Sequence, residues 1–323
     1  MVGILSALGI GVFSIIFVAL MGWGIRGIFI ANIVARILAL GIVEARVRLV
    51  TRHTHLHIST RDVARDIIRY TLPLMPGSLC WWLTGSSDRL FISHYLGLDI
   101  NGLYAVAIRF TGIISTLALI FYQAWQETAI LQYNSPDRDR FFSKMLNRYV
   151  FLLAGIFIGY AFALKVNYSW LVAEQYRESL GFIYPLGLSA VVFAVAAFFD
   201  MGYQCAKDTK RTLPAIVLAA VVNVCLNFLL INPLGVYGVI TTQLITYLVL
   251  VTYRWHDMKR YFVLKIDSRT AIPVLAMLLS AAPFYLSDNT MINILFPVAV
   301  ISLLMWLCRN ELRDLWQKKV KRL

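Results

Sequence analysis

Apolar runs long enough to cross a bilayer recur along the whole chain, and no other feature of the sequence constrains the fold as much. A spanning helix needs roughly 20 apolar residues, and about ten runs approach that length. Of the 323 residues, 59% are hydrophobic and 15% are charged, against about 25% charged residues in soluble domains. The runs are continuous and do not alternate with a period of two, as the strands of an outer-membrane barrel would. The sequence therefore predicts an all-α, polytopic membrane protein.

The basic residues fall on alternate loops between these runs. The expected spans cover residues 2–23, 25–43, 71–96, 102–129, 149–164, 181–204, 213–231, 236–253, 271–287 and 291–307. Of the 30 lysine and arginine residues, 24 lie on one set of loops, 3 on the opposite set and 3 inside spans. Because basic loops stay in the cytoplasm, both termini are expected there. The same rule explains the net charge of +13, so no nucleic-acid partner is expected.

Charged side chains inside two of the runs mark the candidate site. One run contains Asp88 and Arg89, and the next contains Arg109, Gln123 and Glu127. By insertion scales, an Arg or Asp at the centre of a membrane helix costs about 2.5–3.5 kcal/mol, so such residues are kept where they face a protein interior or a wet cavity. The last three residues fall on nearly one face of a helix, whereas Asp88 and Arg89 lie about 100° apart.

The three arginines inside spans, Arg36, Arg89 and Arg109, allow two interpretations. A cationic patch would bind an anionic group such as a phosphate, for which Arg offers two parallel hydrogen bonds. Alternatively, intramembrane ion pairs hold them, for instance Arg109 with Asp88 or Glu127. Arg36 also lies within reach of the cytoplasmic interface, where its guanidinium can snorkel into water.

Other polar positions give weaker signals. Asn223 and Asn227 lie four residues apart on one run, which favours hydrogen bonding between helices over ligand binding. Asp200 lies near the end of another run and is expected at the mouth of a helix.

The sequence contains no motif typical of catalysis or of a metal site. Walker A, GxSxG and HExxH patterns do not occur. His53, His55 and His57 alternate in a basic loop without a carboxylate or cysteine partner. We therefore expect no metal, no cofactor and no enzymatic activity.

A short repeat links the first hairpin with a later one. Residues 24–28, Gly-Ile-Arg-Gly-Ile, recur at an offset of 211 as Gly-Val-Tyr-Gly-Val in residues 235–239. Both copies lie at the turn of a hairpin and run into the following helix. The repeat predicts two halves that each contain such a hairpin, as in transporters built from repeats.

A series of motifs follows the order and spacing of a known family. They are Leu72-Pro73, Ser87-Asp88-Arg89, Leu96-Gly97, Gln123-Ala124-Trp125 and the stretches 102–107, 176–179, 206–210 and 227–235. With these motifs the sequence resembles the polysaccharide flippases of the Wzx type, in the multidrug/oligosaccharidyl-lipid/polysaccharide exporter superfamily. The resemblance covers most of the chain.

The resemblance implies a transporter with two pseudo-symmetric helical lobes around a central cavity. Such a protein would move an undecaprenyl-diphosphate-linked oligosaccharide from the cytoplasmic to the periplasmic leaflet by alternating access, coupled to a proton or sodium gradient. Arg89 and Arg109 would correspond to the cationic residues that hold the diphosphate. Membrane lipids, a polysaccharide polymerase and glycosyltransferases would be partners, and the product would be an O-antigen, lipopolysaccharide or exopolysaccharide.

The resemblance also implies a division of the chain. Members of the family usually have twelve to fourteen helices, so the N-terminal lobe is expected to be incomplete and to lack its first helices. The expected parts are a last hairpin of that lobe (1–45), a cytoplasmic basic loop with an interfacial helix (46–70), a six-helix C-terminal lobe (71–254), a final transmembrane pair (271–308) and a basic amphipathic cytoplasmic tail (309–323).

Three other functions remain open from the sequence. A multidrug or cation antiporter of the same superfamily should favour acidic cavity residues, and the excess inside the spans is basic. A membrane enzyme would need a sizeable polar loop with catalytic residues. A truncated remnant would insert into the membrane without transporting.

Overall fold

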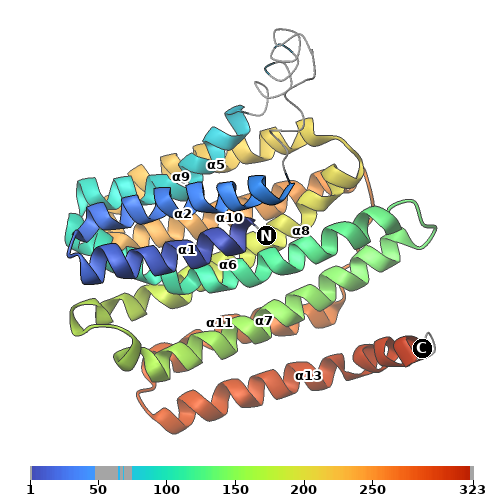
Figure 1. Ribbon diagram of the computed structural model, residues 1–323. Coiled ribbons are helices and arrows are strands. Elements are labelled where there is room, and N and C mark those ends of the chain that lie inside the picture. The colour runs from blue at the N-terminus through green and yellow to red at the C-terminus, as the bar shows by residue number, and fades with distance from the viewer. Residues whose placement is uncertain (1, 48–64, 66–67, 69–74, 321–323) are drawn as a thin grey trace. The chain divides into compact units, whose positions relative to one another are not determined.

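The computed structural model describes residues 2–47, 65, 68 and 75–320, and every regular element in these ranges is a helix. The chain forms two compact units, Met1–Thr71 and Leu72–Leu323 (Figure 1). Within the described residues, eight helical segments are long and apolar enough to cross a membrane, and Ser6–Leu20 is a shorter apolar helix. The all-α, multi-pass fold expected from the sequence is confirmed.

The first unit contains a helical hairpin. Helix α1 (Val2–Ser14) continues as a π-helix, η1 (Ile15–Leu20), and α2 (Gly24–Val47) returns along it. A Cβ atom added to Gly9 would lie 3.0 Å from the Cβ of Ala35, which is itself 2% exposed. Small residues at this crossing let the two backbones approach closely, which is how helices pack inside a bilayer.

The repeated glycines have the same geometry in both hairpins. Gly24 and Gly235 both have a positive φ, of 55° and 57°, a conformation in which glycine avoids the strain of other residues. An added Cβ on Gly27 would lie 3.0 Å from the carbonyl oxygen of Phe17, and one on Gly238 would lie 2.1 Å from that of Leu230. In each copy the first glycine therefore turns the chain, and the second lets the new helix touch the previous one.

The second unit holds the remaining helices. They are α5 (Met75–Tyr95), α6 (Leu98–Gln132), α7 (Arg138–Leu171), η3 (Glu174–Ser179), α8 (Leu180–Cys205), η4 (Thr209–Arg211), α9 (Thr212–Leu234), α10 (Val236–Met258), η5 (Ser268–Thr270), α11 (Ala271–Leu279), α12 (Ala281–Leu286) and α13 (Thr290–Val320). Helix α8 packs against α6, α7 and α10, while α9 packs against α5 and α10. In the core, Trp125 of α6 stacks on Phe198 of α8, with 5.0 Å between ring centroids, and meets Phe142 of α7 edge-on.

Two helices begin or end differently from the expected spans. Helix α7 starts at Arg138, eleven residues before the expected start at 149, and α13 continues to Val320. At 1.5 Å per residue α7 is about 51 Å long, more than the roughly 30 Å of a hydrocarbon core. The helix therefore continues beyond the apolar run, because no Gly or Pro interrupts residues 138–149.

The ninth expected span, 271–287, is broken into α11 and α12 at Ser280. Pro283 explains the break, because its ring clashes with the carbonyl four residues earlier, that of Leu279. Helix α5 is not among the eight apolar segments. Its second half holds the polar run Ser86 to Arg89, which lowers its hydropathy.

The basic loops of the second unit meet at one end of it. Arg211 lies 3.8 Å from Asp257, and the hydroxyl of Tyr261 donates to Asp208 at 2.9 Å. Burial, followed by the hydrogen bond to Asp208, raises the pKa of Tyr261 to about 12. At the opposite end, the ammonium of Lys165 donates to the carbonyls of Phe284 and Ser287 at the end of α12.

Candidate functional site

A buried polar cluster in the second unit surrounds Asp88 and joins three helices, α5, α6 and α9 (Figure 1). The carboxylate of Asp88 is 1% exposed. It accepts hydrogen bonds from the hydroxyl of Tyr104 at 3.1 Å and from the amide of Asn227 at 2.9 Å. The amide nitrogen of Asn223 lies 3.5 Å from the Asp88 carboxylate, the longest distance for a hydrogen bond. The side-chain oxygen of Asn223 accepts a hydrogen bond from the hydroxyl of Ser87 at 2.8 Å.

Helix geometry brings these side chains together from three helices. Asn223 and Asn227 are one turn apart on α9 and are both fully buried, so they face α5 together. Tyr104 comes from the first third of α6. The hydrogen bonding between helices that the sequence predicted for the two asparagines is confirmed, and its partner is Asp88.

Several buried oxygen atoms on α9 and α10 have no hydrogen-bond partner among the described residues. They are Oδ1 of Asn227 and the hydroxyls of Thr242 and Thr246, all buried. The two threonines lie one turn apart on α10, and the phenol of the next residue, Tyr247, interacts electrostatically with Asp88. A buried polar atom left without a partner costs about 1–3 kcal/mol, so an occupant that offers a proton or a positive charge would be stabilised here.

The chemistry of this donor set is that of a proton or a small, hard cation. Carboxylate, amide and hydroxyl oxygens are the ligands that such cations prefer. Within the described residues no three His, Cys, Asp or Glu side chains come close enough to hold a metal ion together. The first hairpin has Ala31 and Ala35 where the repeat offset places Thr242 and Thr246. A hairpin of this geometry therefore forms without hydroxyl groups at the positions of Thr242 and Thr246.

The other predicted site residues are exposed and do not join Asp88. Arg89, next to it on α5, points to a different face, as the 100° separation predicted. Arg109, Gln123 and Glu127 of α6 are all exposed, so their common face is not covered by the second unit. Arg36 is exposed on α2 of the first unit.

The alternative in which Arg109 pairs with Asp88 or Glu127 is wrong for the described residues. The ion pairs of the described part join other groups, and Asp88 is instead held by neutral donors.

A second polar group, missed from the sequence, lies near the basic end of the unit. Arg254 is one of the 24 basic residues that the sequence places on the cytoplasmic loops. In the structure it belongs to α10 and is 2% exposed. Its Nη2 lies 2.8 Å from Oδ1 of Asp200 on α8, and its Nη1 donates to the carbonyl of Ala196 at 2.7 Å. The expected span ended at residue 253, one position short of the residue that could have revealed this pair.

This ion pair lines a cleft of about 230 Å³. Trp81 of α5, Phe193 of α8 and Tyr122 of α6 form aromatic walls, and Ser115 and Thr212 add hydroxyls. The amide of Gln204 donates to the Tyr122 oxygen at 2.6 Å and to Asp200 at 3.2 Å. The cleft is therefore amphipathic, with rings on its walls and a neutralised charge pair at its side.

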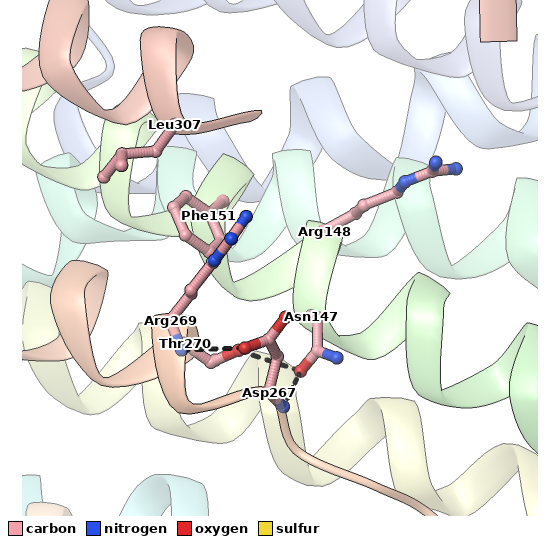
Figure 2. A pocket seen from close by; sticks show the side chains of 7 residues that line it. All are labelled: Asn147, Arg148, Phe151, Asp267, Arg269, Thr270 and Leu307. Atoms are coloured by element: carbon pink, nitrogen blue, oxygen red, sulfur yellow. Dashed lines mark hydrogen bonds between the residues drawn. The ribbon is translucent and has the colours of Figure 1, made fainter. Parts of the chain in front are cut away.

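A smaller cavity of about 20 Å³ lies beside the connection from α10 to α11 (Figure 2). Oδ1 of Asn147 accepts from the hydroxyl of Thr270 at 2.9 Å and from the backbone of Asp267 at 3.4 Å, and its amide donates to the carbonyl of Lys265. A cavity of this volume holds about one water molecule. The cavity is a by-product of the bonds that tie this connection to α7.

Two expectations fall outside the described residues. They are the histidines at 53, 55 and 57 and the interfacial helix expected within residues 46–70.

Comparison with known proteins gives a family match for the first part of the chain. The model of the family described as polysaccharide biosynthesis protein matches residues 2–126. No curated protein sequence matches the chain.

Solved structures share the fold at low sequence identity. The lipid II flippase MurJ in an inward closed conformation gives a TM-score of 0.62 and 14% identity, covering 95% of this chain and 67% of that one. MATE in the straight conformation gives a TM-score of 0.59 and 13% identity, and a MATE mutant gives 0.59 and 14%. Both MATE matches cover 80% of this chain, which spans 62% of the MATE length.

The chain is a multi-pass membrane protein with a fold similar to that of MATE and of MurJ. Its residues 2–126 match the family model of polysaccharide biosynthesis proteins, in agreement with the resemblance read from the sequence.

Proposed function

We propose that the chain takes part in moving a polyprenyl-diphosphate-linked oligosaccharide from the cytoplasmic to the periplasmic leaflet of a bacterial inner membrane. The observation that carries the proposal is the combination of two likenesses. The fold is similar to that of a lipid II flippase over 95% of the chain, and the matched family is one of polysaccharide biosynthesis. The substrate would serve an O-antigen, lipopolysaccharide or exopolysaccharide, with a polymerase and glycosyltransferases as partners.

In this proposal the basic end of the second unit faces the cytoplasm. The lysines and arginines after α8 and α10 and at the start of α7 lie at that end, which follows the positive-inside rule. Both termini would then be cytoplasmic. The hairpin at 1–45 would belong to an N-terminal lobe, 71–254 and 271–308 to the C-terminal part, and 46–70 and 309–323 to the cytoplasmic surface.

The exposed polar face of α6 would contact the substrate. Arg109 is exposed and has no hydrogen-bond or ion-pair partner among the described residues, so its guanidinium is available to form two parallel hydrogen bonds with a diphosphate. Gln123 and Glu127 continue the same face toward the basic end. Arg89 and Arg36 would add positive charge where their helices face the path of the head group.

The Asp88 cluster would couple transport to an ion gradient. The ionised carboxylate of Asp88 would bind a proton or, together with the unpartnered side-chain oxygen of Asn227, a sodium ion, and either one neutralises the buried charge. Because Asp88 links α5, α6 and α9, neutralising it changes the forces between three helices. The bound and empty states would therefore favour different packings, which alternating access requires.

A multidrug or cation antiporter is the second candidate, since the MATE structures share the fold and the buried titratable group is acidic. An antiporter would expel a cationic drug, and its function would not depend on Arg109. No part of either proposal needs catalysis by the chain.

Export of a surface glycan tests the proposal. The chain would be produced in cells that lack their own O-antigen-type flippase, and surface glycan would be compared with cytoplasm-facing lipid-linked precursor. We expect the chain to restore export and Arg109→Ala to abolish it. Arg140 is exposed at the start of α7, and Arg140→Ala should leave export intact. Drug resistance without glycan export would favour the antiporter. Membrane insertion with neither activity would indicate a chain that does not transport on its own.

A further inference from the structure

We infer that the cleft between α5, α6 and α8 is a subsite for one sugar ring of the transported glycan. The inference rests on the proposed function, because it assigns a part of the same substrate to a second place on the lobe. It concerns the cleft with Trp81, Tyr122 and Phe193 on its walls and the Asp200–Arg254 pair at its side.

The electrostatics of the cleft favour a neutral polyol over an anion or an acyl chain. The guanidinium of Arg254 already contacts Asp200 at 2.8 Å, so the pair carries no net charge to attract a second phosphate. A hydrocarbon chain would leave both charged groups without hydrogen-bonding partners on the cleft side, which is costly. A sugar ring presents hydroxyls that donate to a carboxylate and accept from a guanidinium, and bonds to charged groups are the stronger ones.

The aromatic walls supply the other half of sugar recognition. Trp81 meets Phe193 edge-on at 5.5 Å between ring centroids, so the two rings form a corner with fixed orientation. The C–H face of a pyranose is apolar and packs against an aromatic face, while its hydroxyls point outward to polar groups. Rigid aromatic walls with a few fixed polar groups are the usual composition of a pocket for a small ligand.

The polar atoms in the cleft are partly unused. The side chain of Asp200 is 21% exposed, so its carboxylate can accept from a sugar hydroxyl. Ser115 and Thr212 bring two hydroxyls to the lining. The volume of about 230 Å³ lies below the roughly 300–1,000 Å³ of pockets that enclose a drug-sized ligand. It therefore suits one ring of a larger molecule that otherwise stays outside.

The place of the cleft on α6 agrees with the position proposed for the diphosphate. Ser115 and Tyr122 line the cleft, and the neighbouring residues Thr116 and Gln123 belong to the exposed polar face that also holds Arg109. Along the helix axis the cleft begins about 9 Å and ends about 20 Å from Arg109, at 1.5 Å per residue. A glycan attached to a diphosphate at Arg109 would reach the cleft with a ring beyond the first one.

Binding of one bare lipid and two glycolipids to the purified chain tests the subsite. The probes are farnesyl diphosphate without sugar and the same lipid bearing a trisaccharide of hexose or of N-acetylhexosamine units. We expect at least one trisaccharide lipid to bind about tenfold or more tightly than the bare lipid, the factor that one charge-assisted hydrogen bond can supply. Trp81→Ala should remove most of this preference and leave the Kd of the bare lipid unchanged.

Trp82→Ala is the matched control, because Trp82 is the next residue on α5 and is 56% exposed; it should leave the preference intact. Ala197→Leu, which fills the cleft without removing a polar group, should act like Trp81→Ala even if the tryptophan variant is unstable. If the bare lipid and both glycolipids bind with the same Kd, and Trp81→Ala and Ala197→Leu do not change it, the subsite is overturned while the proposed function stands. No saturable binding of the bare lipid, with Arg109→Ala also without effect, overturns the proposed function and the subsite with it.

Discussion

At the scale of single residues, Asp88 is the group whose charge matters most. Asn at this position has nearly the same shape: its oxygen can accept from Asn227, and its NH2 group can donate to the Tyr104 hydroxyl, which can also act as an acceptor. We therefore expect Asp88→Asn to preserve folding but to reduce gradient-driven export by about tenfold or more, the factor that corresponds to 1.4 kcal/mol. Export in vesicles with an imposed proton or sodium gradient measures this. Asp99→Asn, at an exposed carboxylate in the first turn of α6, is the control, and an unchanged ion dependence in Asp88→Asn would contradict the assignment.

The pair of buried Arg254 and partly exposed Asp200 gives a second residue-scale prediction. Removing one partner of a fully buried pair typically costs about 3–5 kcal/mol, and removing Arg254 costs less because the Asp200 carboxylate that is left is 21% exposed, whereas replacing both partners with apolar groups costs still less. We expect Arg254→Met to lower the Tm of the purified protein more than Arg254→Met combined with Asp200→Leu. Arg211 is itself 43% exposed and pairs with Asp208, which is 39% exposed, and more distantly, at 3.8 Å, with Asp257. Arg211→Ala should therefore change stability by only about 0–1 kcal/mol. A double variant less stable than the single one would contradict this account.

At the scale of elements, the hairpin of α9 and α10 depends on Gly238. An added Cβ would lie 2.1 Å from the carbonyl oxygen of Leu230 and 2.6 Å from its carbon, and backbone atoms cannot move aside as a side chain can. Overpacking of this kind typically costs about 1–3 kcal/mol, so Gly238→Ala should lower the Tm clearly. At Gly155 of α7 nothing lies within 4 Å of an added Cβ, so Gly155→Ala should be neutral or stabilising by about 0.5–1 kcal/mol. Equal Tm values for the two variants would disprove the close contact.

At the scale of the whole molecule, the proposed orientation can be read from the two ends of α7. Lys144 lies near the basic end and Glu174 just beyond the other end, and both are exposed. In a background without the native cysteines, we expect a membrane-impermeant maleimide to label Glu174→Cys in right-side-out vesicles and Lys144→Cys only in inside-out vesicles. Labelling of both positions from the same side would refute the assignment of the basic end to the cytoplasm.

Parts of the candidate site followed from the sequence because helix geometry is regular. The 3.6-residue period separated Asp88 from Arg89 and put Asn223 and Asn227 on one face, and the structure agrees on both points. The period could not tell which neighbouring helix each face meets. Thr242, Thr246 and Tyr104 therefore gave no signal, since each is an ordinary residue within an apolar run.

The all-α membrane fold, the approximate spans and the glycines that close the hairpins can all be predicted from the amino-acid sequence. The reason is that a spanning segment must satisfy its backbone hydrogen bonds within itself, so length, apolar composition and turn residues act locally. Only the tertiary structure decided that Asp88 meets Asn227, 139 residues later, and that Asp200 and Arg254 share a cleft with Trp81. Those contacts depend on how each helix is rotated and packed against helices distant in the chain, and no local pattern encodes that rotation.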